Sequence, residues 1–323
     1  MLFRSICAVA KLQDTRTGDT LTVKNKPLEL DPLKFPDPIY RVSIHPVSKT
    51  DEDKLGPALQ KLLQEDPTLH YEREPNTHQE LLAGMGDIHI ETAVEKLKTR
   101  FGVTVEIGEA KVPYKETLKG SAKAQGKYKR QTGGKGQYGD CHLDVSGLPR
   151  GEGFRFENIV VGGAIPKNYI PAVEKGVKEA MEKGILAGFP VVDILAKVYD
   201  GSYHDVDSSE AAFKMAGQIG FRACAEKAQP VILEPIYDLE VDVPDETVGD
   251  VVGDLNTRRG RMQGMEPSSV GRTVIRASVP LATMMRYALD LRSLTKGRGR
   301  FKQTLIGYEE LPFNESEALI KAH

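Results

Sequence analysis

The chain has 323 residues, of which 40% are hydrophobic and 28% are charged, and its formal net charge at pH 7 is −2. This composition is typical of a soluble globular protein and excludes disordered and fibrous chains. No apolar run approaches the roughly 20 residues that a membrane-spanning helix needs. The apolar stretch at the N-terminus ends at Lys11 and is too short for a signal peptide, so we expect a cytoplasmic protein with no membrane segment.

From residue 39 the hydrophobic pattern predicts a β-α-β-β-α-β module of the ferredoxin-like type. The predicted elements are a strand at 40–47, a helix at 50–64, strands at 69–74 and 79–83, a helix at 88–101 and a strand at 103–107. The helices carry apolar residues at helical spacing, and a turn at Pro75-Asn76 separates the two central strands.

The same order of elements returns near the C-terminus. The pattern predicts a strand at 236–243, a helix at 246–259, a turn around Gly264, a strand at 273–279, a helix at 281–294 and a strand at 301–306. The fold class is therefore α+β, with two ferredoxin-like modules on either side of an elongated central α+β domain.

The central domain begins with a long, basic, β-prone segment and continues with strands at 138–145, 153–161 and 191–199. Helices are predicted at 168–183 and at 208–227, the second with Ser208 or Ser209 as its N-cap. The first 38 residues are interpreted as the remnant of a small β domain plus a linker, which suggests a chain truncated at its N-terminus. The expected domains are 1–38, 39–112, 113–233, 234–312 and a C-terminal tail at 313–323.

The cysteines and histidines predict neither catalysis nor a metal site. Cys7, Cys141 and Cys224 lie far apart and form no CxxC pair, so we expect small buried side chains in a reducing compartment. His89 and Glu91 lie two apart on a predicted helix and point in different directions, so a structural role is expected. No Ser-His-Asp or Cys-His arrangement and no acid–base carboxylate pair is recognisable.

Basic residues gather between residues 111 and 135, where eight cations accompany a single acid, Glu116. We define the basic shaft as Lys119, Lys123, Lys127, Lys129 and Arg130. A second run without acids follows at 292–302. Such runs predict anion-facing surfaces, and the alternative is a solvated charged face.

Two loops of the central domain have the composition of an RNA contact. The loop at 130–139 contains four glycines, whose backbone can approach phosphates closely. Its other side chains suit hydrogen bonding and stacking on RNA. The predicted contacts are Gln131, Gly133, Gly134, Lys135, Gln137 and Tyr138. The loop at 201–207 adds His204 and Asp205 at an expected exposed tip, where a histidine can donate to phosphate or sugar oxygens. The alternative for the first loop is a plain β-hairpin turn. The alternative for the second is a histidine that neighbouring carboxylates merely orient.

A third candidate lies in the last module, where Arg258, Arg259 and Arg261 end a predicted helix. These arginines are candidate contacts for an anionic partner. The alternative is structural, because the negative end of the helix dipole attracts cations.

Long segments of the chain resemble bacterial elongation factor G, in the order of that family. They include AKLQDTRTGDTL, GMGDIHIE, RQTGGKGQYGD, GGAIPKNYIPAVEKG, YDGSYHDVDSSEAAFKMA, GDVVGDLNTRRG and DLRSLTKGRG. The resemblance implies the end of domain II followed by domains III, IV and V, with domains III and V ferredoxin-like. Domain IV would be a ribosomal protein S5-like arm that enters the decoding site, with the residues matching Gln131 and His204 facing the codon–anticodon duplex. The implied partners are ribosomal RNA, the tRNA–mRNA complex and large-subunit stalk proteins, bound by a monomer. The resemblance also implies that domain V contacts the ribosome through Arg258, Arg259 and Arg261.

The nucleotide-binding part of that family is not recognisable in this chain. A phosphate loop has the pattern G-x-x-x-x-G-K-[ST], and the nearest segment, TGGKGQ at 132–137, has no serine or threonine after its lysine. We therefore expect neither GTP nor Mg²⁺, the cofactors of the full-length family, to bind this chain, and no GTPase activity from it alone.

Asp140 departs from the commoner family pattern, in which histidine is more usual at this position. We expect its negative charge to lie beside the tip, which leaves two further functions open. One is a paralogue that serves ribosome recycling or protects ribosomes against tetracycline. The other is a free-standing, GTPase-free protein that binds ribosomal RNA.

Overall fold

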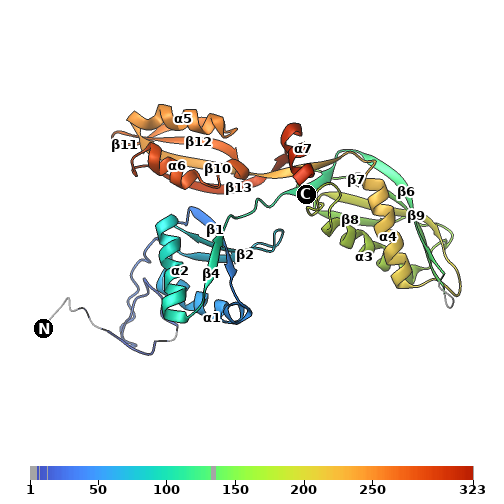
Figure 1. Cartoon of the computed structure of the whole chain (residues 1–323), viewed down its shortest axis with the longest axis horizontal. Coiled ribbons are helices and arrows are strands. Elements are labelled where there is room, and N and C mark those ends of the chain that lie inside the picture. The colour runs from blue at the N-terminus through green and yellow to red at the C-terminus, as the bar shows by residue number, and fades with distance from the viewer. Residues whose placement is uncertain (1–5, 7, 13, 132–135, 323) are drawn as a thin grey trace.

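The computed structural model describes residues 6, 8–12, 14–131 and 136–322, and these residues form an α+β protein with three sheets. Figure 1 shows two modules lying near each other and a long arm that extends away from both. The C-terminus lies where the arm meets the last module, and the N-terminal segment runs outward from the first module. The predicted fold class is confirmed.

The first module has the predicted order of elements: β1 (Tyr40–Pro46), α1 (Lys49–Glu65), β2 (His70–Arg73), β3 (Glu80–Gly84), α2 (Asp87–Phe101) and β4 (Val105–Gly108). Its antiparallel sheet has the order β2-β3-β1-β4. Ser48 caps α1 by accepting a hydrogen bond from the Asp51 N–H. Leu59 and Leu62 of α1 and Leu97 of α2 form the core with Val42 and Ile44 of β1.

The last module repeats this architecture with β10 (Pro230–Pro244), α5 (Val248–Thr257), β11 (Arg261–Ser269), β12 (Arg272–Pro280), α6 (Tyr287–Leu294) and β13 (Arg300–Glu310). The sheet order is β11-β12-β10-β13. One prediction was wrong, because Gly264 lies inside β11 and not in a turn. The β11–β12 register shifts between Met262 and Gly264, and an interior glycine commonly marks such a bulge.

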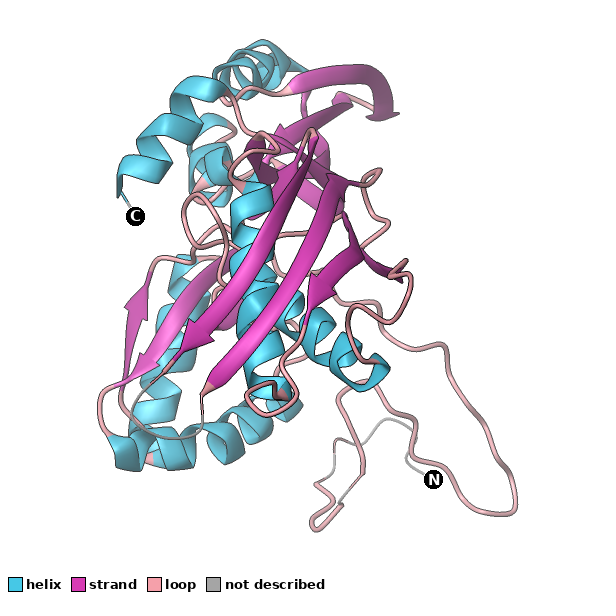
Figure 2. Cartoon of the chain, turned by 90° about the vertical axis from the view of Figure 1, so that its right-hand side faces the viewer, coloured by secondary structure: helices cyan, strands magenta, loops and turns pink. Residues whose placement is uncertain are grey.

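The arm contains β6 (Ser121–Arg130), β7 (Gln137–Gly147), β8 (Phe154–Asn158), α3 (Ile170–Glu182), β9 (Ile194–Ser202) and α4 (Glu210–Ala225). The sheet order is β6-β7-β9-β8, and only the β8–β9 pair is parallel within this sheet. In Figure 2 the arm faces the viewer, with its long strands in front of the helices. The helices therefore cover one face of the sheet and leave the other open.

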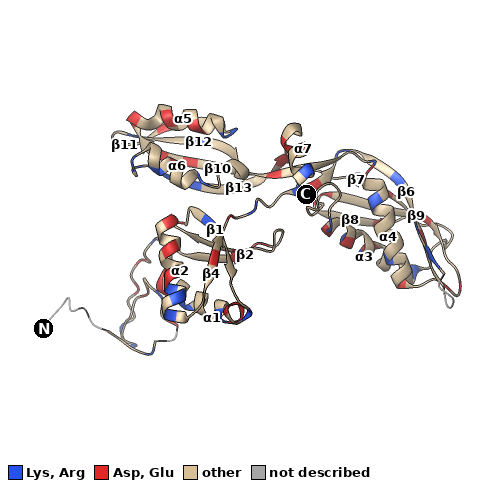
Figure 3. Cartoon of the chain, viewed as in Figure 1, with Lys and Arg blue, Asp and Glu red and all other residues tan. Residues whose placement is uncertain are grey.

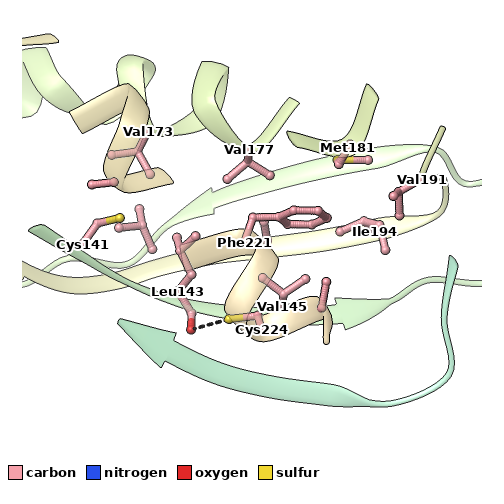
Figure 4. Close-up of a cluster of buried hydrophobic side chains, with 14 of the residues drawn as sticks. Cys141, Leu143, Val145, Val173, Val177, Met181, Val191, Ile194, Phe221 and Cys224 are labelled. Atoms are coloured by element: carbon pink, nitrogen blue, oxygen red, sulfur yellow. Dashed lines mark hydrogen bonds between the residues drawn. The ribbon is translucent and has the colours of Figure 1, made fainter. Parts of the chain in front are cut away.

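The core of the arm lies between this sheet and the two helices (Figure 4). Val173, Val177 and Met181 of α3 and Phe221 of α4 are buried there, and the Cys224 thiol donates to the Leu143 carbonyl at 3.4 Å. A Cβ at Gly126 of β6 would overlap the Ala216 carbonyl oxygen of α4. This glycine is what allows α4 to lie directly on the sheet.

The arm and the last module share a strand. The first residues of β10 pair with β5 (Lys115–Leu118) at the base of the arm, and the rest of β10 lies in the sheet of the last module. Glu116 of β5 is fully buried, and its carboxylate accepts four backbone N–H bonds at 2.6–3.2 Å, from Ile185, Leu186, Ala187 and Phe189. The single acid of the basic segment therefore organises the base of the arm.

Two terminal segments flank the three modules. The described residues before Tyr40 form no strand. The tail contains a helix, α7 (Phe313–Ala322), that the pattern did not predict. None of its residues is fully buried.

Candidate nucleic-acid interface

The two predicted RNA-contact loops meet at the far end of the arm. We call this end the tip and define it as residues 131, 136–138 and 203–209. Asp207 joins the two loops by hydrogen bonds. Its carboxylate accepts from the Gly136 N–H at 3.0 Å, and its carbonyl accepts from the Tyr138 N–H at 2.8 Å. Gly133, Gly134 and Lys135 lie outside the described residues. The sequence suggested Asp207 only as a carboxylate that could orient His204, and it did not reveal that Asp207 joins the two loops.

The imidazole of His204 is held by its own loop. Nδ1 accepts from the backbone N–H groups of Val206 and Asp207, both at 3.3 Å. An accepting Nδ1 assigns the ring proton to Nε2 in the neutral form. The His204 side chain is 58% exposed, and Nε2 has no partner among the residues described. His204 therefore offers a fixed N–H donor to a phosphate or a ribose oxygen.

The other tip residues divide into exposed and internally bonded groups. Gln131, Gln137 and Asp205 are exposed. The Tyr138 hydroxyl instead lies 2.7 Å from Ser202 Oγ, which donates onward to Asp140 at 2.6 Å. Because Ser202 uses its proton on Asp140, Tyr138 must be the donor to Ser202. Tyr138 thus braces the tip, and only its ring is left to meet a ligand.

Asp140 lies beside the tip, as expected, but its carboxylate does not reach the tip surface. Its side chain lies within the sheet and the residue is only 5% exposed. The carboxylate accepts from Gln125 of β6 at 2.8 Å and from Ser202 of β9 at 2.6 Å, and so ties both strands to β7. The Asp140 carboxylate is enclosed because β6, β7 and β9 lie side by side in the sheet. The number of charges along the sequence does not reveal this burial.

The basic shaft follows β6, an edge strand of the arm's sheet (Figure 3). Lys123, Lys127 and Lys129 are exposed while Ala124 and Gly126 between them face α4, as the two-residue period of a strand requires. Lys123 lies 3.6 Å from Asp144. Lys127, Lys129 and Arg130 form no ion pair with any described residue.

Lys119 precedes β6 and differs from the rest of the shaft. Its ammonium lies 2.6 Å from Glu310 of β13. Lys119 therefore bonds the base of the arm to the last module. Of the shaft residues, it is the least available to an external anion.

The arginines of the last module have internal partners. The Arg258 guanidinium contacts Asp254 and Asp290, each at 2.7 Å, and donates to the Thr283 carbonyl at 2.6 Å. These hydrogen bonds to carboxylates outweigh its burial and raise the pKa of Arg258. Its side chain is only 15% exposed, so the structural alternative holds for this residue.

Arg259 is engaged even more closely. It binds Glu234 through two hydrogen bonds of 2.6 and 2.8 Å and reaches Glu315 of α7 at 3.0 Å. The hydrogen bonds to Glu234 raise its pKa. Arg261 is different, because its side chain is 71% exposed and is paired at the surface with Glu309 at 2.7 Å. Among the three, only Arg261 remains available to a partner.

No catalytic or metal chemistry emerges from the described residues. No group of three histidine, cysteine or acidic residues there could hold a metal ion. His89 bonds Asp66 at 2.9 Å and accepts from the Met85 N–H, which is the expected structural role. Burial raises the pKa of the Cys141 thiol to about 12. No helix in this part of the chain is long and apolar enough to cross a membrane.

Comparison with known families assigns these modules. Residues 35–109 match the model for "Elongation Factor G, domain III", residues 110–229 match "Elongation factor G, domain IV", and residues 231–319 match "Elongation factor G C-terminus". The chain belongs to the elongation factor G family. It is a part of a translation factor that comprises these three consecutive domains, in the order that the sequence resemblance implies. The arm is domain IV.

A solved structure agrees with this assignment. A crystal structure of a protein from Thermus thermophilus is 46% identical and superposes with a TM-score of 0.79. The match covers 90% of this chain and 43% of the other. The chain therefore spans less than half of that protein.

Proposed function

We propose that this chain is the ribosome-engaging part of a factor that promotes movement of the tRNA–mRNA complex. Domain IV acts as an arm whose tip enters the decoding site and whose basic shaft contacts phosphates of ribosomal RNA. The last module contacts the large subunit and its stalk proteins, with Arg261 as the available arginine. The protein acts as a monomer in the cytoplasm.

The observation that carries this proposal is the joined tip. Asp207 joins the two loops by hydrogen bonds. The His204 imidazole offers an N–H donor, and backbone N–H groups of its own loop hold the ring in place. Pre-organised donors lose little conformational entropy when they bind. Phosphate contacts along the shaft supply affinity without sequence dependence, while the tip supplies position.

Nucleotide chemistry is not proposed for this chain. Its sequence holds no recognisable phosphate-loop pattern of the kind that holds GTP and Mg²⁺. The proposed action of the arm is steric and electrostatic: it occupies the aminoacyl site and opposes backward slippage of the tRNA–mRNA complex.

The alternative of a recycling or protection paralogue rests on Asp140, where histidine is more usual in the family, and that departure stands. The Asp140 carboxylate is buried and bonded within the sheet, so it does not reach the tip surface. The polar tip with His204 favours translocation, which is the function that we propose.

Binding of the purified chain to ribosomes tests the proposal. Ribosomes with an empty aminoacyl site should bind the chain with an affinity that falls steeply with salt. Ribosomes whose aminoacyl site already holds tRNA should bind it much more weakly, because the arm and the tRNA compete for one space. Equal binding to both kinds of ribosome would overturn the proposed placement of the arm.

A further inference from the structure

We propose that the loop of residues 159–168 is a third RNA contact of the arm, in which the Lys167 ammonium meets a backbone phosphate. This inference rests on the proposed function and extends it to a loop outside the tip. The loop connects β8 to α3 and contains the sequence IVVGGAIPKN.

The sheet topology delivers this loop to the side of the tip. β8 runs parallel to β9, so both strands leave the sheet in the same direction. Beyond β8, the Ile159 N–H still donates to the Val198 carbonyl of β9 at 2.9 Å. The Ile165 side chain then packs so closely on Gly201 that a Cβ there would lie 2.6 Å from it. The loop therefore follows β9 to its end.

Tyr169 fixes the end of this loop to the tip. Its ring stacks on Phe213 with centroids 4.8 Å apart, and its hydroxyl donates to the Ser208 carbonyl at 3.4 Å. Ser208 also closes the His204 turn by accepting from the His204 N–H at 2.9 Å. Lys167 thus stands two residues from an anchor that is bonded directly to the His204 loop.

The exposed part of the loop presents groups that suit a sugar–phosphate backbone. Lys167 and Asn168 are exposed, and neither side chain has a hydrogen-bond or ion-pair partner in the described ranges. Two lysines of the neighbouring helices are paired, Lys178 with Glu174 at 2.6 Å and Lys214 with Glu179 at 3.1 Å. Lys167 is therefore an uncompensated cation beside the tip.

Two glycines keep the backbone of the loop accessible. Gly162 and Gly163 have φ values of 71° and 74°, and a Cβ on either would meet no atom within 4 Å. Positive φ disfavours side chains here, so the N–H groups stay open to a ligand. A cation, an amide and exposed backbone N–H groups are the donors that proteins use for the RNA backbone.

Directed hydroxyl-radical cleavage tests where the loop lies on the ribosome. The probe is Fe(II)-EDTA tethered to a single cysteine at position 167, 183 or 204, in the full chain with Cys7→Ser. Cys141 and Cys224 are buried and burial raises the pKa of both thiols, so they should not take up the probe. Lys183 is the matched control, because it is exposed at the opposite end of α3.

The proposal expects cleavage of decoding-region RNA from positions 167 and 204 and not from position 183. Cleavage from 204 without cleavage from 167 would overturn the third contact and leave the proposed function standing. No decoding-region cleavage from either position would overturn both. Cross-linking from position 167 to a ribosomal protein instead of RNA would show that the class of partner is wrong.

Affinity provides the second readout. Lys167→Ala should weaken ribosome binding about five- to tenfold near 0.1 M salt and should lower the slope of log K against log salt by about 0.7–0.9. Lys183→Ala should leave both quantities unchanged. Equal effects of the two substitutions would mean that Lys167 contributes only general charge, which would contradict a phosphate contact.

Discussion

The arm and the last module both carry runs of cations, yet the two regions use them in opposite ways. On β6 of the arm, Lys127 and Lys129 are exposed and have no ion pair with a described residue. In the last module Arg258 and Arg259 each bind two carboxylates. The comparison shows that a basic run in the sequence does not by itself reveal whether its cations are free for an external anion, because the fold decides which of them are paired.

The difference follows from the local structure around each run. An edge strand repeats every two residues and directs alternate side chains to solvent, and the shaft lysines occupy that exposed face. The arginines instead follow a helix end, at a junction where β10, α6 and α7 bring Glu234, Asp290 and Glu315 together. These carboxylates lie far from the arginines in the sequence.

The largest expected effect comes from breaking the Arg259–Glu234 pair. Glu234 is 2% exposed, and removing its partner leaves a buried charge, which costs about 3–5 kcal/mol. Arg259→Ala should therefore destabilise the last module by about that amount. Hydrogen exchange of β10 and β12 measures this free energy locally.

Arg261→Ala is the control for this experiment. Arg261 is paired at the surface, where an ion pair contributes about 0–1 kcal/mol. If both substitutions change exchange equally, then Arg259 does not have the structural role assigned to it.

The next effect concerns the helix that supports the shaft. A side chain at Gly126 would overlap the Ala216 carbonyl of α4, and overpacking of this kind typically costs about 1–3 kcal/mol. Gly126→Ala should lower the melting temperature of the arm and expose more of β6 to exchange. Gly253→Ala in α5 is the control, because its Cβ would meet nothing within 4 Å and alanine favours helix by about 1 kcal/mol. A stable Gly126→Ala variant would contradict the close packing of α4.

The stability of the last module should depend on pH through the paired carboxylate of Asp242. Burial raises the pKa of Asp242, but hydrogen bonds from Arg272 and Arg300 outweigh it and lower the pKa below its ordinary value of 3.8. The resulting stabilisation is complete above about pH 4 and is lost as the pH falls further. Asp242→Asn should cost about 1–3 kcal/mol at pH 7, and the difference from the unchanged chain should shrink towards pH 2.

Thermal unfolding at both pH values measures that difference, with Asp205→Asn at the tip as a control that should change stability at neither. Asp205 is exposed and accepts no hydrogen bond from a described side chain or backbone group. A constant penalty for Asp242→Asn from pH 7 to pH 2 would show that the pairing with Arg272 and Arg300 does not stabilise the fold.

The smallest effect on stability is expected in the shaft. Replacing Lys123, Lys127 and Lys129 together by alanine should change the free energy of unfolding by less than about 0.5 kcal/mol for each residue. The same variant should lower the salt slope of ribosome binding by up to about 0.9 for each lysine that binds a phosphate in the unchanged chain. An unchanged slope would mean that these lysines are only a solvated face.

Much of the fold follows from the sequence because its signals are local. Leu55, Leu59 and Leu62 recur at helical spacing, and the two modules repeat one order of strands and helices. The bulge at Gly264 was missed because a glycine in a strand and a glycine in a turn look alike without the register of the neighbouring strand. Helix α7 was not predicted, and it buries no residue fully.

The candidate site was predictable only in part. Loop composition predicted Gln131 and His204 as RNA contacts, since glycines and polar side chains cluster there, and both residues are exposed at the tip. The joining role of Asp207 and the burial of Asp140 depend on hydrogen bonds across 62 to 71 positions in the chain. Tertiary structure determines these hydrogen bonds, so neither the hydrophobic periodicity nor the number of charges in the sequence predicts them.

The central claim, that the tip acts through the outward N–H donor of His204, is tested most directly by translocation rates. His204 would be replaced in a full-length elongation factor G that carries this chain as its C-terminal domains. Asparagine can keep the Nδ1-like acceptor for Val206 and Asp207 but lacks the outward donor, whereas glutamine can restore a donor near the Nε2 position.

The account predicts that His204→Asn slows single-round translocation about as much as His204→Ala and that His204→Gln recovers part of the rate. Ribosome binding and multiple-turnover GTP hydrolysis on empty ribosomes should stay near normal in all three, because one hydrogen bond contributes only about 0.5–1.5 kcal/mol. Normal translocation by His204→Asn, or loss of hydrolysis with translocation intact, would contradict the account.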